Sequence, residues 1–471
     1  MSPVNFPDRF SCRRIGILFL ALASSTLVTA ASSTVDSIAA LQKQVQAATP
    51  GDTITLKNGR YETSAPIAVA CAGAEGRPIT IAAESVGGVE IGGTNGFNVT
   101  KPAAHVVIVG FKLTHASGKN AIAAGTTRVR FTRNTFQCTG AGPYLSVSGD
   151  DAQVDYNEFR DKKTVGNMIN VTGAGTQVAR NLWIHHNYFH DFTNARENGA
   201  ETIRFGLSGL SMSTGRGLVE HNLFVRCKGE NELISNKSCG NTYRYNTFLD
   251  SEGTQLTLRH GNDCLVYGNY FRNTDGLRIF GDRHQVFSNY FEGNSLGINL
   301  GNGDGEVADG AKLTCHDRPD HCVVAFNTLI ENKTHYQMNG RKDGMGATNT
   351  TFANNILVGG GTAVKIEGPN PGAKYVGNLF WRTKDAGNIS SDGFTSSDPR
   401  LVADTNGIFH LQAGSAAIDS AVGDFPAATH DQDGQPRAGK KDQGADEFST
   451  APATARILTV QDVGPDAKSS P

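Results

Sequence analysis

Two glutamates and a lysine stand close together in the middle of the chain, in the stretch Gly229-Glu-Asn-Glu-Leu-Ile-Ser-Asn-Lys-Ser238. Glu230 and Glu232 are two residues apart, so both carboxylates leave the same side of a β-strand. Like charges that close repel unless a cation joins them, and an all-oxygen ligand set suits a hard cation such as calcium. Lys237 is five residues after Glu232, an odd number, so in a regular strand the two side chains would point to opposite faces. It reaches the same face only if Ser235-Asn236 makes a turn, which those residue types favour.

Other segments place polar side chains at alternating positions between apolar ones. In Leu256-Thr-Leu-Arg-His-Gly261 the leucines alternate with Thr257 and Arg259. This period of two is typical of a strand with one buried face. A solvated charged face without function is the simpler alternative. We expect one outward face to collect Asn198, Arg204, Glu230, Glu232, Lys237, Arg259, His260 and Arg278.

Such a set could cut a uronic-acid polymer by β-elimination, in which a base removes the proton α to the carboxylate and the 4-linked oxygen departs. That carbon acid is very weak while the carboxylate is negative. A calcium ion on the carboxylate neutralises it and stabilises the enolate-like intermediate. A lysine can be the base only when it is neutral, which nearby positive charge favours. An arginine is a fixed cation suited to stabilising, and even protonating, the departing oxygen.

A repeated motif predicts the elements that position these residues. Asn-x-Phe or Asn-x-Leu has its asparagine at positions 134, 157, 187, 222, 246, 269, 289, 327, 355 and 378, with a base period of 20 to 24 residues and several insertions. About 22 residues at roughly 3.3 Å per residue suffice for three short strands and three turns. Stacked turns bury a continuous core that one turn cannot bury alone. Leucine-rich repeats share the period, but their leucine spacing is absent.

The sequence therefore predicts an all-β fold, a right-handed parallel β-helix. Stacked asparagines should pass amide hydrogen bonds from coil to coil, and stacked phenylalanines should fill the interior. Ile38, Leu41 and Val45 have helical spacing before Pro50-Gly51, which predicts a short amphipathic helix over the N-terminal end of the solenoid.

The first thirty residues have the layout of a secretory signal. Arginines at 9, 13 and 14 precede the apolar run 15–22, and small residues at 28–30 suit signal peptidase. A retained membrane anchor is the alternative, but the apolar run is short for one. We expect a signal peptide at 1–30, a parallel β-helix catalytic domain at 31–390, and irregular terminal coils, a cap and a tail at 391–471.

Composition limits the partners. The formal net charge is −2, with 43 Lys and Arg against 45 Asp and Glu, which argues against a nucleic-acid binder. Removal of the signal should leave a secreted or periplasmic protein that does not associate with a membrane, and a monomer is favoured.

Seven cysteines remain after the signal, so at least one thiol is free. Cys315 and Cys322 lie in a polar stretch and are the best candidates for a disulfide in an oxidising compartment. His316 and His321 beside them could suggest zinc, but the usual ligand spacing is absent.

Two other functional classes stay open. A pectin-type glycoside hydrolase shares the β-helix and needs two placed carboxylic acids, which Gly149-Asp150-Asp151 could offer. However, that pair lies several coils before Arg259-His260, and Gly-Asp-Asp is a common turn. A glycan-binding solenoid without activity would not need a lysine beside paired glutamates.

At the residues quoted above the chain resembles polysaccharide lyase family 6, whose members include alginate lyases and chondroitinase B. The stretches that carry the resemblance are 229–238, Asn246-Thr-Phe248, 256–261 and Asn198-Gly-Ala-Glu-Thr-Ile-Arg204. The resemblance implies that Lys237 is the Brønsted base and Arg259 the acid. It further implies that calcium is held by Asn198, Glu230 and Glu232, with Arg204, His260 and Arg278 near the substrate.

One departure from the family pattern concerns Gln255, because the stretch between Lys237 and Arg259 is one residue longer than usual. A local bulge would absorb the extra residue. The implied substrate is an anionic polysaccharide. Alginate is favoured over dermatan sulfate because the outward cations are few and a sulfated polymer should need more. The preference for mannuronate or guluronate stays open, as does endo or exo action.

Overall fold

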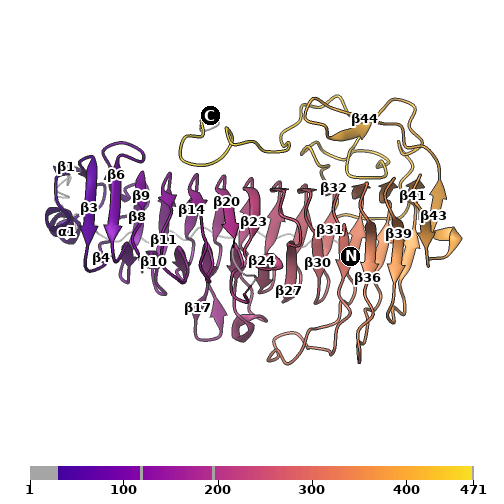
Figure 1. Cartoon of the computed structure of the whole chain (residues 1–471), viewed down its shortest axis with the longest axis horizontal. Helices are drawn as coiled ribbons and strands as arrows, with labels where there is room; N and C mark the ends of the chain where they lie inside the picture. The colour runs from indigo at the N-terminus through magenta and orange to yellow at the C-terminus, as the bar shows by residue number, and fades with distance from the viewer. Residues whose placement is uncertain (1–29, 117–119, 194–196, 469–471) are drawn as a thin grey trace, which may run out of the picture.

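The computed structural model describes residues 30–116, 120–193 and 197–468. Three long parallel sheets run side by side along one solenoid (Figure 1). Sheet one has 14 strands from β1 (Ser32–Val35) to β40 (Lys374–Val376), and sheet three has 14 strands from β3 (Gly59–Thr63) to β43 (Phe394–Ser396). Successive coils add one strand to each sheet, which confirms the predicted parallel β-helix.

Sheet two has 13 strands, and the predicted outward residues Arg204, Arg259 and Arg278 lie on its strands. Its strands are β4 (Ile67–Val69), β7 (Phe97–Val99), β10 (Asn120–Ile122), β13 (Leu145–Val147), β16 (Ile169–Val171), β21 (Ile203–Phe205), β24 (Glu232–Lys237), β27 (Gln255–His260), β30 (Leu277–Ile279), β33 (Ile298–Leu300), β36 (Thr334–Met338), β39 (Thr362–Ile366) and β42 (Asp385–Gly387).

The repeated asparagines form a buried hydrogen-bonded ladder. The backbone N–H and the side-chain amide of Asn222 both donate to Oδ1 of Asn246 at 3.0 Å, and Asn246 repeats both bonds to Asn269. The same pairing joins the other coils from Asn134 to Asn378. The residue before each asparagine turns the corner with a positive φ, as at Tyr245 (52°). Such a conformation is costly for a side chain, so the ladder must hold each corner in place.

A column of stacked rings fills the interior next to the ladder, as predicted. Successive rings of Phe136, Phe159, Phe189, Phe224, Phe248, Phe271 and Phe291 lie 4.4 to 4.8 Å apart, centroid to centroid. Because every coil contributes the same ring at the same place, the coils cannot slip relative to one another without opening the core.

The N-terminal end of the solenoid is covered by α1 (Ile38–Ala47) (Figure 1). Ser37 caps this helix by accepting a hydrogen bond from the Ala40 N–H at 3.3 Å. Leu41 and Val45 are buried against the first coils, so the predicted helix is confirmed. Within the described part of the chain, no helix has the length and apolar character needed to cross a bilayer.

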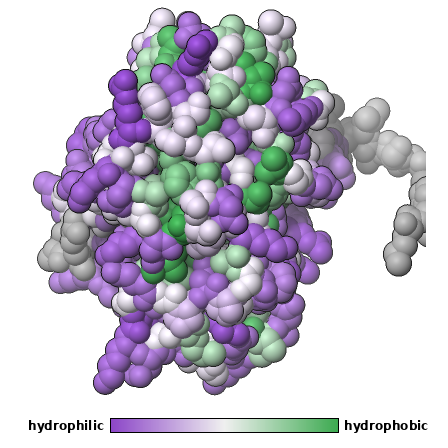
Figure 2. All heavy atoms as spheres, turned by 90° about the vertical axis from the view of Figure 1, so that its right-hand side faces the viewer, coloured by the Kyte–Doolittle hydropathy of each residue, from purple (hydrophilic) through white to green (hydrophobic). Residues whose placement is uncertain are grey.

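The C-terminal segment does not continue the solenoid. After β43 the chain turns back and runs along the outside of sheet three (Figure 1). Leu458 and Val463 pack there on Leu223 and Val225 of β23 (Leu223–Lys228). On the surface at the C-terminal end of the solenoid, where the chain makes this turn, hydrophobic residues occur only in small groups between polar ones (Figure 2). The chain's own C-terminal segment therefore covers part of the outer face of sheet three.

The predicted Cys315–Cys322 disulfide is wrong. All seven cysteines within the described ranges are unpaired. Cys322 immediately precedes β34 (Val323–Ala325), and its buried thiol donates to the Gly281 carbonyl at 3.3 Å. Cys315 lies in the loop before it, with its thiol against Gly305. Cys322 faces the solenoid interior, which a thiol on the loop surface does not reach.

We expect Asn246→Ala to destabilise the protein clearly. The backbone and side-chain N–H groups of Asn222 would lose their acceptor in a buried site, at about 1–3 kcal/mol for each unsatisfied group. The free energy of unfolding from urea titration measures the effect. Asn98→Ala is the matched control, because Asn98 faces outward on β7. Equal losses for the two variants would contradict the role of the ladder.

Candidate active site

Polar side chains form a row on the outer face of sheet two. The strand register aligns Arg204 of β21 with Ser235 of β24, then with Thr257 of β27 and Arg278 of β30. Neighbouring strands lie about 4.8 Å apart, so Arg204 and Arg278 mark the ends of a row about 14 Å long. The predicted alternation is confirmed here, since Leu256 and Leu258 are buried on the opposite side of β27.

Two bulges in the β24–β27 pairing aim the central side chains. Leu233 is an extra residue on β24, between Glu232 and Ile234, and Arg259 is an extra residue on β27, opposite the step from Asn236 to Lys237. The predicted turn at Ser235-Asn236 is wrong, because both residues lie within β24. Instead, the extra residue Leu233 shifts the alternation by one, so that Glu232 and Lys237 point to the same face. Bulges of this kind re-aim side chains next to functional sites.

A small pocket of about 160 Å³ opens where these bulges lie. It is lined by Asn198, Glu230, Asn231, Glu232, Lys237, Arg259 and Arg278. Six of the eight predicted site residues therefore surround one pocket. Gly229 allows this geometry, because a Cβ at that position would lie 2.1 Å from the Ala200 carbonyl oxygen.

Three buried carboxylates converge at the pocket. Glu201, Glu230 and Glu232 each place one oxygen within 4.8 Å of the others. Glu230 accepts a hydrogen bond from the Gly199 N–H at 2.8 Å, and Glu201 accepts one from Asn167 at 2.8 Å. Burial, followed by the charges of Glu201 and Glu232, raises the pKa of Glu230 to about 7. This cluster needs a proton or a cation, and its all-oxygen donors fit calcium.

Cations face the carboxylates from the other side of the pocket. Glu232 pairs with Arg278 and lies 3.4 Å from Nε of Arg259, and the Ser235 hydroxyl donates to it as well. Nζ of Lys237 lies 3.5 Å from Oε1 of Glu201. The amine is thus held at the edge of the acidic cluster, next to the two arginines.

The remaining two predicted residues flank this pocket. Nε of Arg204 donates to Oδ1 of Asn170 at 3.1 Å, so its guanidinium is held on the outer row. His260 is buried at the end of β27. Burial, then the neighbouring Arg259 and His316, lowers the pKa of His260 to about 3. Its imidazole is therefore neutral at ordinary pH.

Besides Asn231, two residues near the site were not among the predicted site residues. Glu201 was part of the quoted motif Asn198–Arg204, but it precedes β21, where strand parity gives no direction for its side chain. His316 comes from the long loop between β33 and β34, and its ring lies 5.9 Å from that of His260. In the sequence this loop is visible only as a longer step between Asn289 and Asn327, and that step does not predict where the loop lies in the fold.

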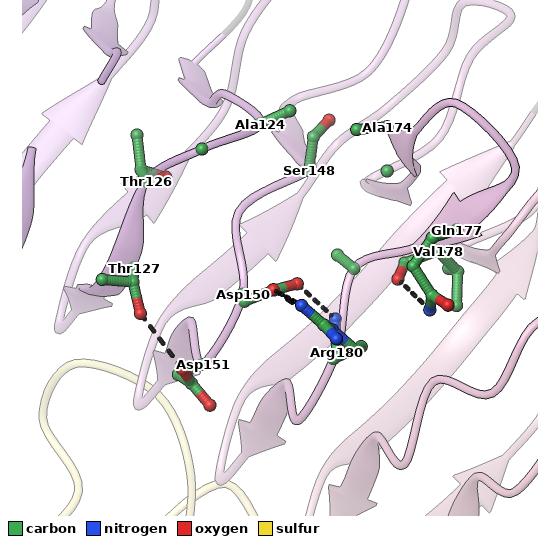
Figure 3. A pocket seen from close by; sticks show the side chains of 13 residues that line it. Ala124, Thr126, Thr127, Ser148, Asp150, Asp151, Ala174, Gln177, Val178 and Arg180 are labelled. Carbon is green, nitrogen blue, oxygen red and sulfur yellow. Dashed lines mark hydrogen bonds and ion pairs between the residues drawn. The ribbon is translucent and has the colours of Figure 1, made fainter. Parts of the chain in front are cut away.

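The alternative acid pair, Asp150 and Asp151, lies in another pocket of about 420 Å³ (Figure 3). Asp150 forms two hydrogen bonds with the Arg180 guanidinium, at 2.7 and 3.2 Å. Asp151 turns the chain with φ 54° and accepts from Thr127 and Asn181. Both carboxylates are engaged in holding a turn, which does not suit a pair of catalytic acids.

The fold and the pocket together define a class: a parallel β-helix protein with an acidic, cation-flanked site on the outer face of one sheet. Residues 35–356 match the family model described as Chondroitinase B. Because this match spans well over half of the chain, the protein belongs to the chondroitinase B family. The resemblance to polysaccharide lyase family 6 is confirmed.

Solved structures agree with this placement. AlyGC, a PL6-family alginate lyase, is 26% identical with a TM-score of 0.71, over 81% of this chain and 55% of that one. A mannuronic-acid-specific family 6 lyase from human gut microbiota is 25% identical with a TM-score of 0.66, over 78% and 91%. A PL6 alginate lyase in complex with a trisaccharide is 20% identical with a TM-score of 0.68, over 93% and 96%, and shows the shared fold alone.

The present chain thus spans little more than half the length of AlyGC. A comparison with curated proteins found no match.

We expect Glu230→Gln to stabilise the metal-free protein at pH 8. The folded-state pKa of Glu230, about 7, exceeds the ordinary value of 4.5, so wild type loses stability as pH rises between these values. The glutamine variant avoids a loss on the order of 1–3 kcal/mol. Unfolding in the presence of a chelator at pH 4 and pH 8 measures this difference.

The matched control is Glu75→Gln, which changes an exposed carboxylate. Its pH profile should follow that of wild type. A Glu230→Gln profile that also follows wild type would show that the pKa of Glu230 is not raised in the folded protein.

Proposed function

We propose that this protein is a polysaccharide lyase that cleaves 4-linked uronic-acid polymers, alginate above all, by calcium-assisted β-elimination. One observation carries the proposal: a buried cluster of three carboxylates shares a pocket with Lys237 and Arg259. A lysine and an arginine beside a cation site are what removal of a weakly acidic carbon-bound proton requires.

The residues that would hold calcium are Glu230 and Glu232, with Asn198 at the rim and Glu201 as an addition to the predicted set. They supply oxygen donors only. The raised pKa of Glu230 reflects burial and, after it, repulsion by Glu201 and Glu232, which a divalent cation would relieve. When bound, calcium would neutralise the substrate carboxylate adjacent to the carbon that loses its proton.

Lys237 is the proposed base. Its amine faces the pocket and takes the proton α to the substrate carboxylate, and the electron pair of that bond forms a carbon–carbon double bond. The bond to the 4-linked oxygen breaks in the same sequence. Arg259 stabilises the departing oxygen and supplies its proton. Neutral His260 offers a hydrogen bond at the edge of the pocket.

Arg204 and Arg278 are proposed to bind sugar carboxylates along the outer row. Arg278 is half-buried and already paired with Glu232, so few cations are left for sulfate groups. This balance favours alginate. Two solved relatives that are 25–26% identical, the alginate lyase AlyGC and the mannuronic-acid-specific family 6 lyase, support the same choice. A dermatan sulfate lyase is the second candidate, favoured by the description of the matching family model. A glycan-binding β-helix without activity is a weaker candidate.

We also propose that the protein is exported and acts as a monomer outside the cytoplasm. The support is the signal-like sequence at the start of the chain, of which residues 1–29 lie outside the described ranges. Amino-terminal sequencing of the exported protein tests this, and a start near residue 31 is expected.

We expect Lys237→Ala to lower turnover of alginate by about a hundredfold or more, since a general base contributes 10²–10⁴-fold. Release of the unsaturated sugar, followed by its ultraviolet absorbance, is the measurement. Arg259→Ala should behave similarly. Asp150→Ala should retain nearly full activity, because Asp150 is bound to Arg180.

Retention of more than about a tenth of wild-type turnover in Lys237→Ala would remove this residue from the mechanism. Loss of activity in Asp150→Ala alone would favour hydrolysis.

Chelation should abolish turnover, and added calcium should restore it better than zinc does, because the pocket offers oxygen donors only. Glu230→Gln and Glu232→Gln should each raise the calcium concentration needed for half-maximal rescue, while Glu75→Gln should not. Full activity after exhaustive chelation, with no metal found by elemental analysis, would rule out the calcium-assisted mechanism.

A further inference from the structure

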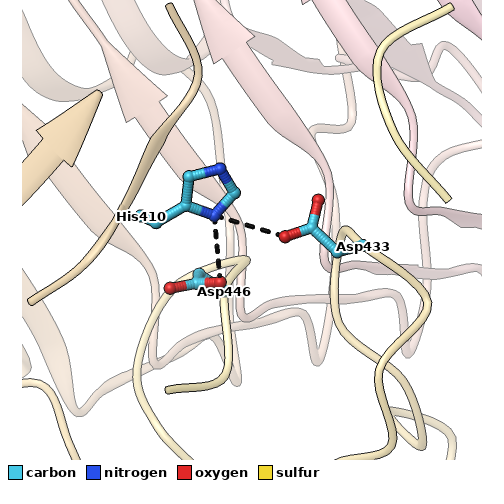
Figure 4. Close-up of side chains that lie close together, drawn as sticks. All are labelled: His410, Asp433 and Asp446. Carbon is cyan, nitrogen blue, oxygen red and sulfur yellow. Dashed lines mark hydrogen bonds and ion pairs between the residues drawn. The ribbon is translucent and has the colours of Figure 1, made fainter. Parts of the chain in front are cut away.

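A second cluster of metal-ligating side chains lies in the C-terminal segment, away from the active-site pocket (Figure 4). His410 belongs to β45 (Phe409–Leu411), and its Nδ1 lies 3.2 Å from Oδ2 of Asp433 and 3.3 Å from Oδ1 of Asp446. Both aspartates are buried and His410 is half-buried. Three donor atoms from three separate parts of the segment therefore converge on one point.

The other oxygen of each carboxylate is already engaged. Oδ1 of Asp433 accepts from the Tyr270 hydroxyl at 2.9 Å, and Oδ2 of Asp446 accepts from the Leu411 N–H at 2.6 Å. On the far side of the ring, Nε2 of His410 lies 3.8 Å from a carboxylate oxygen of Asp404. This is how protein metal sites orient their ligands: a further partner fixes each ligand, and a carboxylate faces the second imidazole nitrogen.

Gln432 provides an independent indication of a missing partner. The residue is fully buried, and its Oε1 has no hydrogen-bond partner. Its amide nitrogen lies 3.4 Å from Nδ1 of His410, so the amide group sits at the same point as the three donors. Half a turn about the last side-chain bond would present the amide oxygen there. Buried polar atoms without a partner are rare and call for an explanation.

The convergence requires a positive charge. Nδ1 and two carboxylate oxygens all present electron pairs to one another. A proton on Nδ1 would be shared between the two carboxylates, and it would leave Gln432 Oε1 without a partner. A metal ion can accept all four donors at once.

We propose that His410, Asp433 and Asp446, with Gln432 as a fourth donor, bind a divalent transition-metal ion. One imidazole nitrogen and three oxygens suit zinc and its neighbours, whereas calcium takes oxygen ligands. The site is separate from the calcium pocket and does not depend on the proposed function. Its effect is structural: the ion joins segments 404–411, 431–435 and 442–447, and Tyr270 of β29 (Tyr270–Arg272) ties them to the solenoid.

The test uses the full chain without its signal, in a Glu230→Gln/Glu232→Gln background that weakens the other site. After chelation and dialysis, Co²⁺ is added and the visible absorption recorded, and zinc bound per chain is measured by elemental analysis. We expect one zinc per chain and cobalt bands of a nitrogen-and-oxygen site. At a zinc concentration tenfold above Kd, proteolytic cleavage within 397–448 should slow about tenfold.

His410→Ala should lose the bound zinc, the cobalt bands and the protection from protease. His430→Ala, which removes an exposed histidine of the same segment, should keep all three. If the protein with His410 intact shows neither cobalt bands nor protection by zinc, the proposal is overturned, and the three side chains share a proton instead. Equal zinc binding by His410→Ala would overturn it as well.

Discussion

The stacking of one coil directly on the next is the constraint on which the rest of the structure depends. The asparagine ladder and the column of phenylalanine rings allow one register only, because a slip would leave buried amides unpaired and open the core. This register places residues that are 20 to 40 positions apart in sequence in one outer row. Arg204, Ser235, Thr257 and Arg278 are neighbours for that reason alone. A rigid row of this kind can hold a polymer without first having to become ordered.

Charge balance then determines what the row can do. Glu201, Glu230 and Glu232 are buried together, and Arg259, Arg278 and Lys237 surround them. Neither set would be stable there without the other, since an isolated buried charge is costly. The two bulges bring the sets together on the outer face of sheet two. Part of sheet three is covered by the C-terminal segment, which packs on Leu223 and Val225 and accepts a hydrogen bond from Tyr270.

Much of this could be predicted from the sequence, for physical reasons that differ between elements. The period of the Asn-x-Phe motif gives the fold, and alternation within 256–261 gives the outward face. Parity alone, however, could not place Lys237, because a bulge at Leu233 shifts the strand where a turn at Ser235-Asn236 was expected. Glu201 precedes its strand, and His316 lies in an insertion, so neither has a periodic signal. The Cys315–Cys322 prediction rested on proximity in sequence, and it failed because Cys322 points into the core.

The central claim is elimination rather than hydrolysis, and the mass of the products tests it most directly. Purified alginate is incubated with the protein in the presence of calcium, and any released oligosaccharides are analysed by mass spectrometry. Elimination breaks the chain without adding water, so each new non-reducing end should carry an unsaturated uronate that is one water lighter than a hydrolysis product. Oligosaccharides that have gained one water at every cut would contradict the account and point to a hydrolase on the same solenoid.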